Sequence, residues 1–176
     1  MIGGAPRDWV TRVTSDPMGI RPLASDEEAA QCARMMAATD PWITLGRGYE
    51  ASLERIRDPS REVYVATDES GLAGCLILCM AGAFVGYIQT VIVAPNAQGK
   101  GIGSRLVEFA EDRIFKESPN AFLCVSSFNS GARRLYERLG YQYVGELTDY
   151  IVTGHSELLF RKTRGPWTDF LARTES

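Results

Sequence analysis

Apolar and polar residues alternate with two different periods along the chain, and the switches between them predict strands interleaved with helices. Segments with a period of two, or short apolar β-branched runs, favour strands, and segments with a period near 3.6 favour helices. Strands are expected at residues 18–23, 62–66, 72–80, 84–93, 122–125, 141–147 and 151–161. Helices are expected at residues 25–39, 47–57, 101–115 and 129–139.

Capping residues sharpen several of these boundaries. Ser25 followed by Glu28 forms a capping-box pattern at the start of the first helix. Pro41 predicts that this helix has ended before Asp40, because the residue before proline avoids the helical region. Asn129 is a favourable N-cap for the last helix, and Gly140 is suited to the position just after its end.

The resulting order predicts an α/β (α+β) fold in which a mixed central sheet of about seven strands has helices on both faces. We expect one domain at residues 17–162. Residues 1–16 are irregular and contain Gly and Pro, so they are expected to form an N-terminal arm. Residues 163–176 are polar and are expected to form a loose C-terminal tail.

Composition excludes several classes of protein. The chain has 176 residues, 45% of them hydrophobic, which suits one soluble globular domain. A net charge of -3 argues against non-specific nucleic-acid binding, and no apolar run is long enough to span a membrane. One His and four Cys without a C-x-x-C pair make a metal site or a disulfide framework unexpected. With no secretion signal evident, the cytoplasm is the expected compartment.

Three glycines at alternate positions, Gly99, Gly101 and Gly103, separate a strand from a helix. Such a turn presents free N–H groups and the positive end of a helix dipole, so it predicts a phosphate site. A P-loop is excluded because Gly101 follows Lys100 where Ser or Thr is needed. A dinucleotide loop is excluded because Ser104 stands where the third glycine belongs. The alternative interpretation, a glycine-rich turn that binds no ligand, is left open.

The remaining template, Q/R-x-x-G-x-G/A, fits Gln98, Gly101 and Gly103, and it resembles the pyrophosphate loop of the GNAT superfamily of N-acetyltransferases. A second segment, residues 125–141, is similar to the family helix N-x-x-A-x-x-x-Y-x-x-x-G-F/Y. Its matching residues are Asn129, Ala132, Tyr136, Gly140 and Tyr141.

The resemblance implies a sheet that splays between the fourth and fifth strands and holds acetyl-coenzyme A (acetyl-CoA) in the gap. It implies that the pantetheine arm lies along Val91, Ile92 and Val93, and that Asn129 and Tyr136 also contact the cofactor. The backbone amides implied to hold the pyrophosphate are those of Gln98, Gly99, Lys100, Gly101, Ile102, Gly103 and Ser104. The alternative for Lys100 is a solvated position at the surface. The alternative for Asn129 is that it only caps the last helix.

The implied chemistry is acyl transfer from a thioester to a primary amine. The resemblance makes Tyr136 the acid that protonates the departing thiolate; the alternative is that Tyr136 only packs on the buried stripe of its helix. Tyr87 begins a strand similar to that of protein N-terminal acetyltransferases, some of which use a tyrosine there with a histidine on the next strand. Cys124 stands at the histidine position, so Tyr87 is a candidate base, an orienter of water, or a core aromatic residue. His155 is expected at the surface.

Acceptor recognition in this family implies contacts from Asp40, Trp42 and Tyr150. The Tyr87 strand favours a peptide or protein N-terminus as the primary-amine substrate. The alternatives are a small amine, such as a polyamine or an amino sugar, and a non-catalytic CoA-binding sensor. A homodimer is left open.

Overall fold

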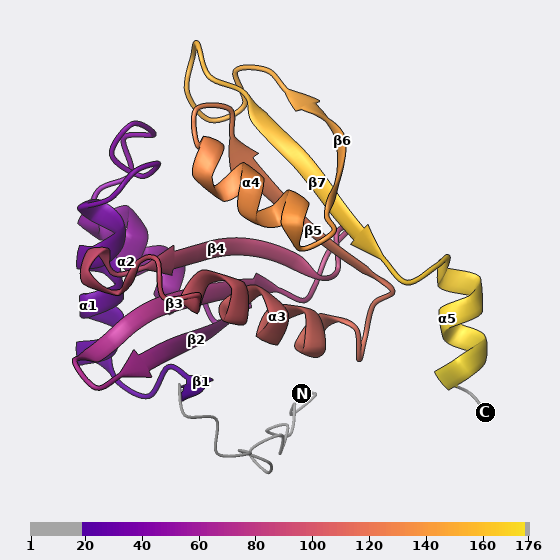
Figure 1. Cartoon of the computed structure of the whole chain (residues 1–176), viewed down its shortest axis with the longest axis horizontal. Coiled ribbons are helices and arrows are strands. Elements are labelled where there is room, and N and C mark those ends of the chain that lie inside the picture. Colours follow the sequence, from indigo (N-terminus) through magenta and orange to yellow (C-terminus); the bar gives the residue numbers. More distant parts are fainter. Residues whose placement is uncertain (1–18, 175–176) are drawn as a thin grey trace, which may run out of the picture.

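The computed structural model describes residues 19–174, and within them seven strands form one sheet surrounded by five α-helices (Figure 1). The strands are β1 (Ile20–Pro22), β2 (Arg61–Asp68), β3 (Gly71–Cys79), β4 (Tyr87–Val93), β5 (Asn120–Ser126), β6 (Gln142–Leu147) and β7 (Glu157–Thr163). The helices are α1 (Asp26–Ala37), α2 (Tyr49–Arg57), α3 (Ile102–Ile114), α4 (Ser130–Arg138) and α5 (Trp167–Thr174), with a 3-10 turn η1 (Pro95–Ala97). The predicted arm at residues 1–16 lies outside the described residues.

The strand order is β1-β2-β3-β4-β5-β7-β6, and only the central β4–β5 pair is parallel. The neighbouring pairs on either side are antiparallel. This confirms the expected mixed sheet.

The two faces of the sheet carry two separate cores. On β3, Leu76 and Leu78 pack in the core that contains α3, whereas Cys75 and Ile77 pack against α1 and α2. Successive side chains on a strand point to opposite faces, so these neighbours require helices on both sides. The prediction of helices on both faces is therefore confirmed, and it explains why β3 is an almost continuous apolar run.

The sheet opens between β4 and β5. The two strands pair only at Tyr87–Phe122 and Ile88–Leu123, although β4 continues to pair with β3 as far as Val93. The closed end of this paired segment is held at Gly86, whose carbonyl accepts a hydrogen bond from the Phe122 N–H at 2.9 Å. Gly86 has φ +88°, and an added Cβ would lie 2.5 Å from the Asn120 carbonyl oxygen, so only glycine fits there. Beyond Ile88, the β5-facing edge of β4 is left unpaired by β5.

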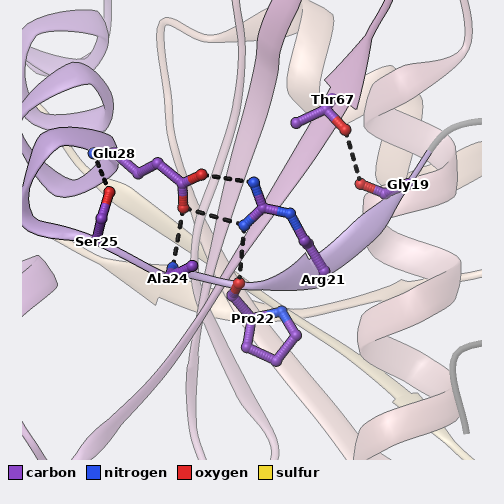
Figure 2. Close-up of polar contacts among 7 residues, drawn as sticks. All are labelled: Gly19, Arg21, Pro22, Ala24, Ser25, Glu28 and Thr67. Carbon is purple, nitrogen blue, oxygen red and sulfur yellow. Dashed lines mark hydrogen bonds and ion pairs between the residues drawn. The ribbon is translucent and has the colours of Figure 1, made fainter.

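Helix α1 begins as the capping pattern predicts, with one difference (Figure 2). The Ser25 hydroxyl accepts a hydrogen bond from the Glu28 N–H at 3.2 Å. The Glu28 carboxylate accepts from the Ala24 N–H at 2.9 Å, not from the N–H of the cap residue itself. It also binds the Arg21 guanidinium, which joins β1 to the start of α1.

Two predicted segments at the C-terminal end are wrong. The last strand begins at Glu157 rather than at residue 151, because the Asp149 carboxylate accepts from the Gly154 N–H at 2.6 Å and closes a loop. The tail after Thr163 contains α5, which Figure 1 places beside the far end of β7. Trp167 and Phe170 pack edge to face at 5.8 Å on this helix. None of the described helices combines the length and apolar character needed to cross a membrane.

Candidate active site

A cavity of about 550 Å³ passes through the opening between β4 and β5. On the side of α1 and α2 it is lined by Trp42 and Arg55. On the side of α3 and α4 it reaches Asn129 and Tyr136. One continuous space therefore connects the two faces of the sheet, which a fully paired sheet would not allow.

The cavity brings together six of the residues predicted to form the site. These are Trp42, Tyr87, Val91, Asn129, Tyr136 and Tyr150. The glycine loop lies beyond the end of β4, outside the cavity lining, and Ile92 packs in the core under α1 and α2. Asp40 does not line the cavity either; its carboxylate accepts from the Thr44 N–H at 3.1 Å and the Thr44 hydroxyl at 2.7 Å, which disfavours the predicted substrate contact.

The glycine loop has the backbone that an anion site needs. Gly99 and Gly101 have φ angles of +76° and +79°, in the left-handed region that glycine tolerates best. Gly101 is the N-cap of α3 and has no side chain to accept the free N–H groups of the first turn. Those groups and the helix dipole fit a pyrophosphate. Lys100 is exposed, and its Nζ lies 3.9 Å from the Asp68 carboxylate.

Tyr136 occupies the wall of the cavity formed by α4. The residue is only 7% exposed, and burial raises the pKa of its phenol to about 12. The phenol is therefore protonated at neutral pH and can act only as a proton donor. Tyr136 also belongs to the core around α3, with Tyr141 edge to face at 5.9 Å, so the packing role and the cavity-facing position coexist.

Asn129 both caps a helix and lines the cavity. Its side-chain oxygen accepts from the Ala132 N–H at 3.1 Å, which confirms the predicted N-cap of α4. The same residue is part of the cavity wall. The side-chain amide nitrogen thus stays available to a ligand.

Tyr87 and Cys124 both line the cavity, from the two parallel strands, and each affects the pKa of the other. Burial is the main cause that raises the pKa of the Tyr87 phenol far above its ordinary value, and Cys124 raises it further. A phenol with a strongly raised pKa is already protonated at neutral pH, so it cannot accept a proton. The raised pKa therefore disfavours the base role for Tyr87 and favours a role in orienting water by hydrogen bonding.

Glu157 is the acidic residue that the sequence analysis missed. Its side chain lines the cavity at 5% exposure and accepts a hydrogen bond from the Ser126 hydroxyl at 2.5 Å. Burial raises the pKa of this carboxyl, while Ser126 and, more weakly, Arg47 oppose the shift. His155, two residues earlier, packs against Phe128 at 4.9 Å and does not line the cavity.

Gln89 supplies a further polar group to the cavity. Pairing between β3 and β4 shifts from Ile77–Thr90 to Leu78–Ile88, so Gln89 lies in a bulge. Its side-chain oxygen is buried, and no described residue donates a hydrogen bond to it. A buried acceptor of this kind is suited to a donor from a ligand.

Comparisons with known proteins identify the family of this chain. The sequence profile of the acetyltransferase (GNAT) family matches residues 27–141. An uncharacterised N-acetyltransferase of Chlorobaculum tepidum is 27% identical over 115 residues, covering 65% of this chain and 72% of the relative. The blasticidin-S acetyltransferase of Streptomyces morookaense is 31% identical over 90 residues, covering 47% of this chain and 66% of the relative.

Solved structures share the fold at lower identity. An aminoglycoside 6'-N-acetyltransferase complexed with coenzyme A has a TM-score of 0.69 at 18% identity, covering 85% of this chain and 98% of that one. The spermidine N-acetyltransferase of Vibrio cholerae, in complex with CoA and spermine, has a TM-score of 0.65 at 19% identity, covering 88% of this chain and 98% of that one. With the profile match over most of the domain, the chain belongs to the acetyltransferase (GNAT) family, whose members take the acetyl group from acetyl-CoA.

Proposed function

We propose that this protein transfers the acetyl group of acetyl-CoA to the primary amine of a small molecule. The observation that carries the proposal is the cavity that crosses the sheet, with the Tyr136 phenol on one side and the Glu157 carboxyl on the other. A thioester on the α4 side and an amine on the α2 side meet in such a space.

The donor is held mainly by backbone groups. The edge of β4 at Val91, Ile92 and Val93 has no partner on β5, so it can pair with the amides of the pantetheine arm. The amides from Gln98 to Ser104 receive the pyrophosphate at the start of α3. Asn129 contacts the arm with the nitrogen of its amide.

The acceptor must lose a proton before it attacks. An alkyl ammonium has a pKa near ~10.4, so it is charged at neutral pH. We assign its proton to Glu157, because a carboxyl whose pKa is raised is a stronger base when it is ionised. The Gln89 oxygen orients the same nitrogen by accepting a second N–H.

The reaction then balances without a covalent enzyme intermediate. The amine nitrogen bonds to the acetyl carbon as the carbon–sulfur bond breaks, and Tyr136 gives its proton to the leaving sulfur. The product nitrogen then loses a second proton, which restores the Tyr136 phenol, and Glu157 releases to solvent the proton that it took from the ammonium group. Burial raises the pKa of both cavity thiols, Cys79 and Cys124, above the ordinary range. These thiols are protonated and weakly nucleophilic, which favours direct transfer.

A small amine is favoured over the peptide N-terminus that the Tyr87 strand predicted. The names of the relatives specify small amines, among them spermidine and aminoglycosides. Neither of these names specifies a peptide or a protein as the acceptor.

The test is a panel of amines with acetyl-CoA, followed by thiol release and by mass spectrometry of the products. Wild-type protein should acetylate at least one small amine. Tyr136→Phe should lower kcat at saturating substrates by about 100-fold, the scale of a lost general acid. Tyr143→Phe, which changes an exposed tyrosine on β6, is the matched control and should retain full activity. CoA binding without acetylation of any amine would instead establish a non-catalytic CoA-binding module.

A further inference from the structure

Three arginines gather on the α2 side of the cavity. Arg47 precedes α2, Arg55 lies on α2, and Arg61 begins β2, and all three line the cavity. Glu157 is the single acidic residue among the cavity-lining residues. This region is therefore positively charged, although the chain as a whole has a net charge of -3.

The three guanidinium groups differ in their partners. Arg61 is held by the Asp58 carboxylate at 3.1 Å and by the Cys79 sulfur. For the side chains of Arg47 and Arg55, no ion pair or hydrogen bond is found among residues 19–174. Both are partly buried, and a guanidinium removed from water without a partner is unfavourable.

The charges also act on one another. Burial lowers the pKa of Arg55, and Arg47 and Arg61 lower it further, as expected for like charges held close together. Two unpaired guanidinium groups that repel each other on one side of a cavity are suited to bind an anion, and their fork geometry suits carboxylate or phosphate oxygens.

Arg47 also links this region to the proposed base, since it acts electrostatically on Glu157 as well as on Arg55. Arg47, Arg55 and Glu157 also line the same cavity. One acceptor that carries both an amine and a negative group can therefore contact the arginines and the proposed base together.

We infer that the acceptor amine carries an anionic group, as an amino acid does, and that Arg47 and Arg55 bind that group. The inference rests on the proposed function and narrows its substrate class. A polyamine, which is positive throughout, would face these arginines unfavourably.

The test uses pairs of amines that differ only in the anion. Each of several amino acids is compared with its carboxamide, and phosphoethanolamine is compared with ethanolamine; spermidine is added as a polycation. We expect kcat/KM for at least one anionic member to exceed that of its neutral partner by about tenfold or more, the effect of about one charge-assisted contact. The carboxylate and phosphate arms identify which anion is bound.

Variants then locate the site. Arg55→Met should raise KM for the anionic amine about tenfold and leave the neutral partner unchanged, with partial rescue in Arg55→Lys. Arg57→Met is the matched control, because Arg57 lies on the same helix but is exposed and paired with Asp26. Thermal stabilisation by CoA should be equal in all variants and shows that they are folded.

The outcomes separate the two proposals. Turnover of neutral or polycationic amines at rates equal to or above those of the anionic ones overturns this inference and leaves the acetyltransferase function intact. An anion preference that survives in Arg55→Met also overturns it. Acetylation of no amine at all overturns both.

Discussion

The proposed donor side of the site is built mainly from backbone groups, whereas the proposed acceptor side is built from charged side chains. On the donor side, the open edge of β4 and the start of α3 present N–H and C=O groups, and the glycines set their conformation. On the acceptor side, Arg47, Arg55 and Glu157 present charges from three separate elements. A backbone site tolerates change in most side chains, but a charge-based site changes its specificity with a single substitution. The donor side can therefore stay constant while the acceptor side determines the substrate.

Among the variants that separate the acceptor side from the donor side, we expect Glu157→Gln to have the largest effect on activity. The substitution keeps the size of the side chain and an acceptor for Ser126, but it removes the base. We expect kcat/KM for the amine to fall by about 100-fold at neutral pH, with KM for acetyl-CoA unchanged. The loss should shrink as pH rises toward the pKa of the free amine, because the amine then needs no base. An equal loss at every pH would contradict the base role.

The same variant tests the pKa of Glu157 through stability. Burial raises the folded-state pKa of Glu157, so the contribution of this group to stability is complete below its unfolded pKa and is lost as pH rises through its folded pKa. At neutral pH Glu157→Gln should therefore be at least as stable as wild type. Thermal unfolding measured from pH 7 down to pH 4 should show wild type gaining stability relative to the variant. A variant that is less stable at neutral pH would show that ionised Glu157 is structural.

An intermediate effect, confined to the donor side, is expected from Gly101→Ala. Its φ of +79° makes the change costly by about 1 kcal/mol even though a Cβ would meet no atom within 4 Å. We expect KM for acetyl-CoA to rise about fivefold to tenfold, since the loop amides lose their alignment, while KM for the amine is unchanged. Gly154→Ala carries the same strain at φ +86° in the loop before β7 and is the matched control for stability. If Gly101→Ala and Gly154→Ala raised KM for acetyl-CoA equally, the loop before α3 would have no specific role in binding the cofactor.

The smallest effect is expected from Lys100→Met. The side chain is exposed and 3.9 Å from Asp68, and exposed ion pairs contribute little, at most about 1 kcal/mol. We expect KM for acetyl-CoA to change by less than about threefold, and the change to vanish at high salt. Asp68→Asn, which breaks the ion pair and keeps Lys100, is the control. A tenfold rise in KM would show that Lys100 binds phosphate directly, and the donor side would then depend on a side chain as well.

The proposed donor side could be derived from the sequence because its parts lie in two short segments. Gln98, Gly101 and Gly103 lie within six residues at the start of α3. Asn129 caps the helix that carries Tyr136, so spacing alone relates these two residues. Glycine spacing and helix capping depend on residues close together in sequence, so a short segment is enough to predict them.

Trp42 and Tyr150 of the proposed acceptor side were predicted, but its charged residues Arg55 and Glu157 were not, for the opposite reason. Arg55 and Arg57 are two charged residues near the end of one helix, and only the packing of α2 determines that Arg55 faces the cavity while Arg57 pairs with Asp26. Glu157 meets Ser126 through strand pairing across 31 positions of sequence. Helix α5 carried a local signal that was overlooked, since Trp167, Phe170 and Leu171 have helical spacing.

The opening between β4 and β5 has a kinetic consequence. Because the cavity joins both faces of the sheet, the two substrates bind in one space without competing for the same wall. Burial raises the pKa of the cavity thiols, which disfavours storage of the acetyl group on Cys79 or Cys124 between binding of donor and acceptor. For the proposed function we therefore expect turnover through a ternary complex, in which a poor acceptor slows catalysis without release of a modified enzyme.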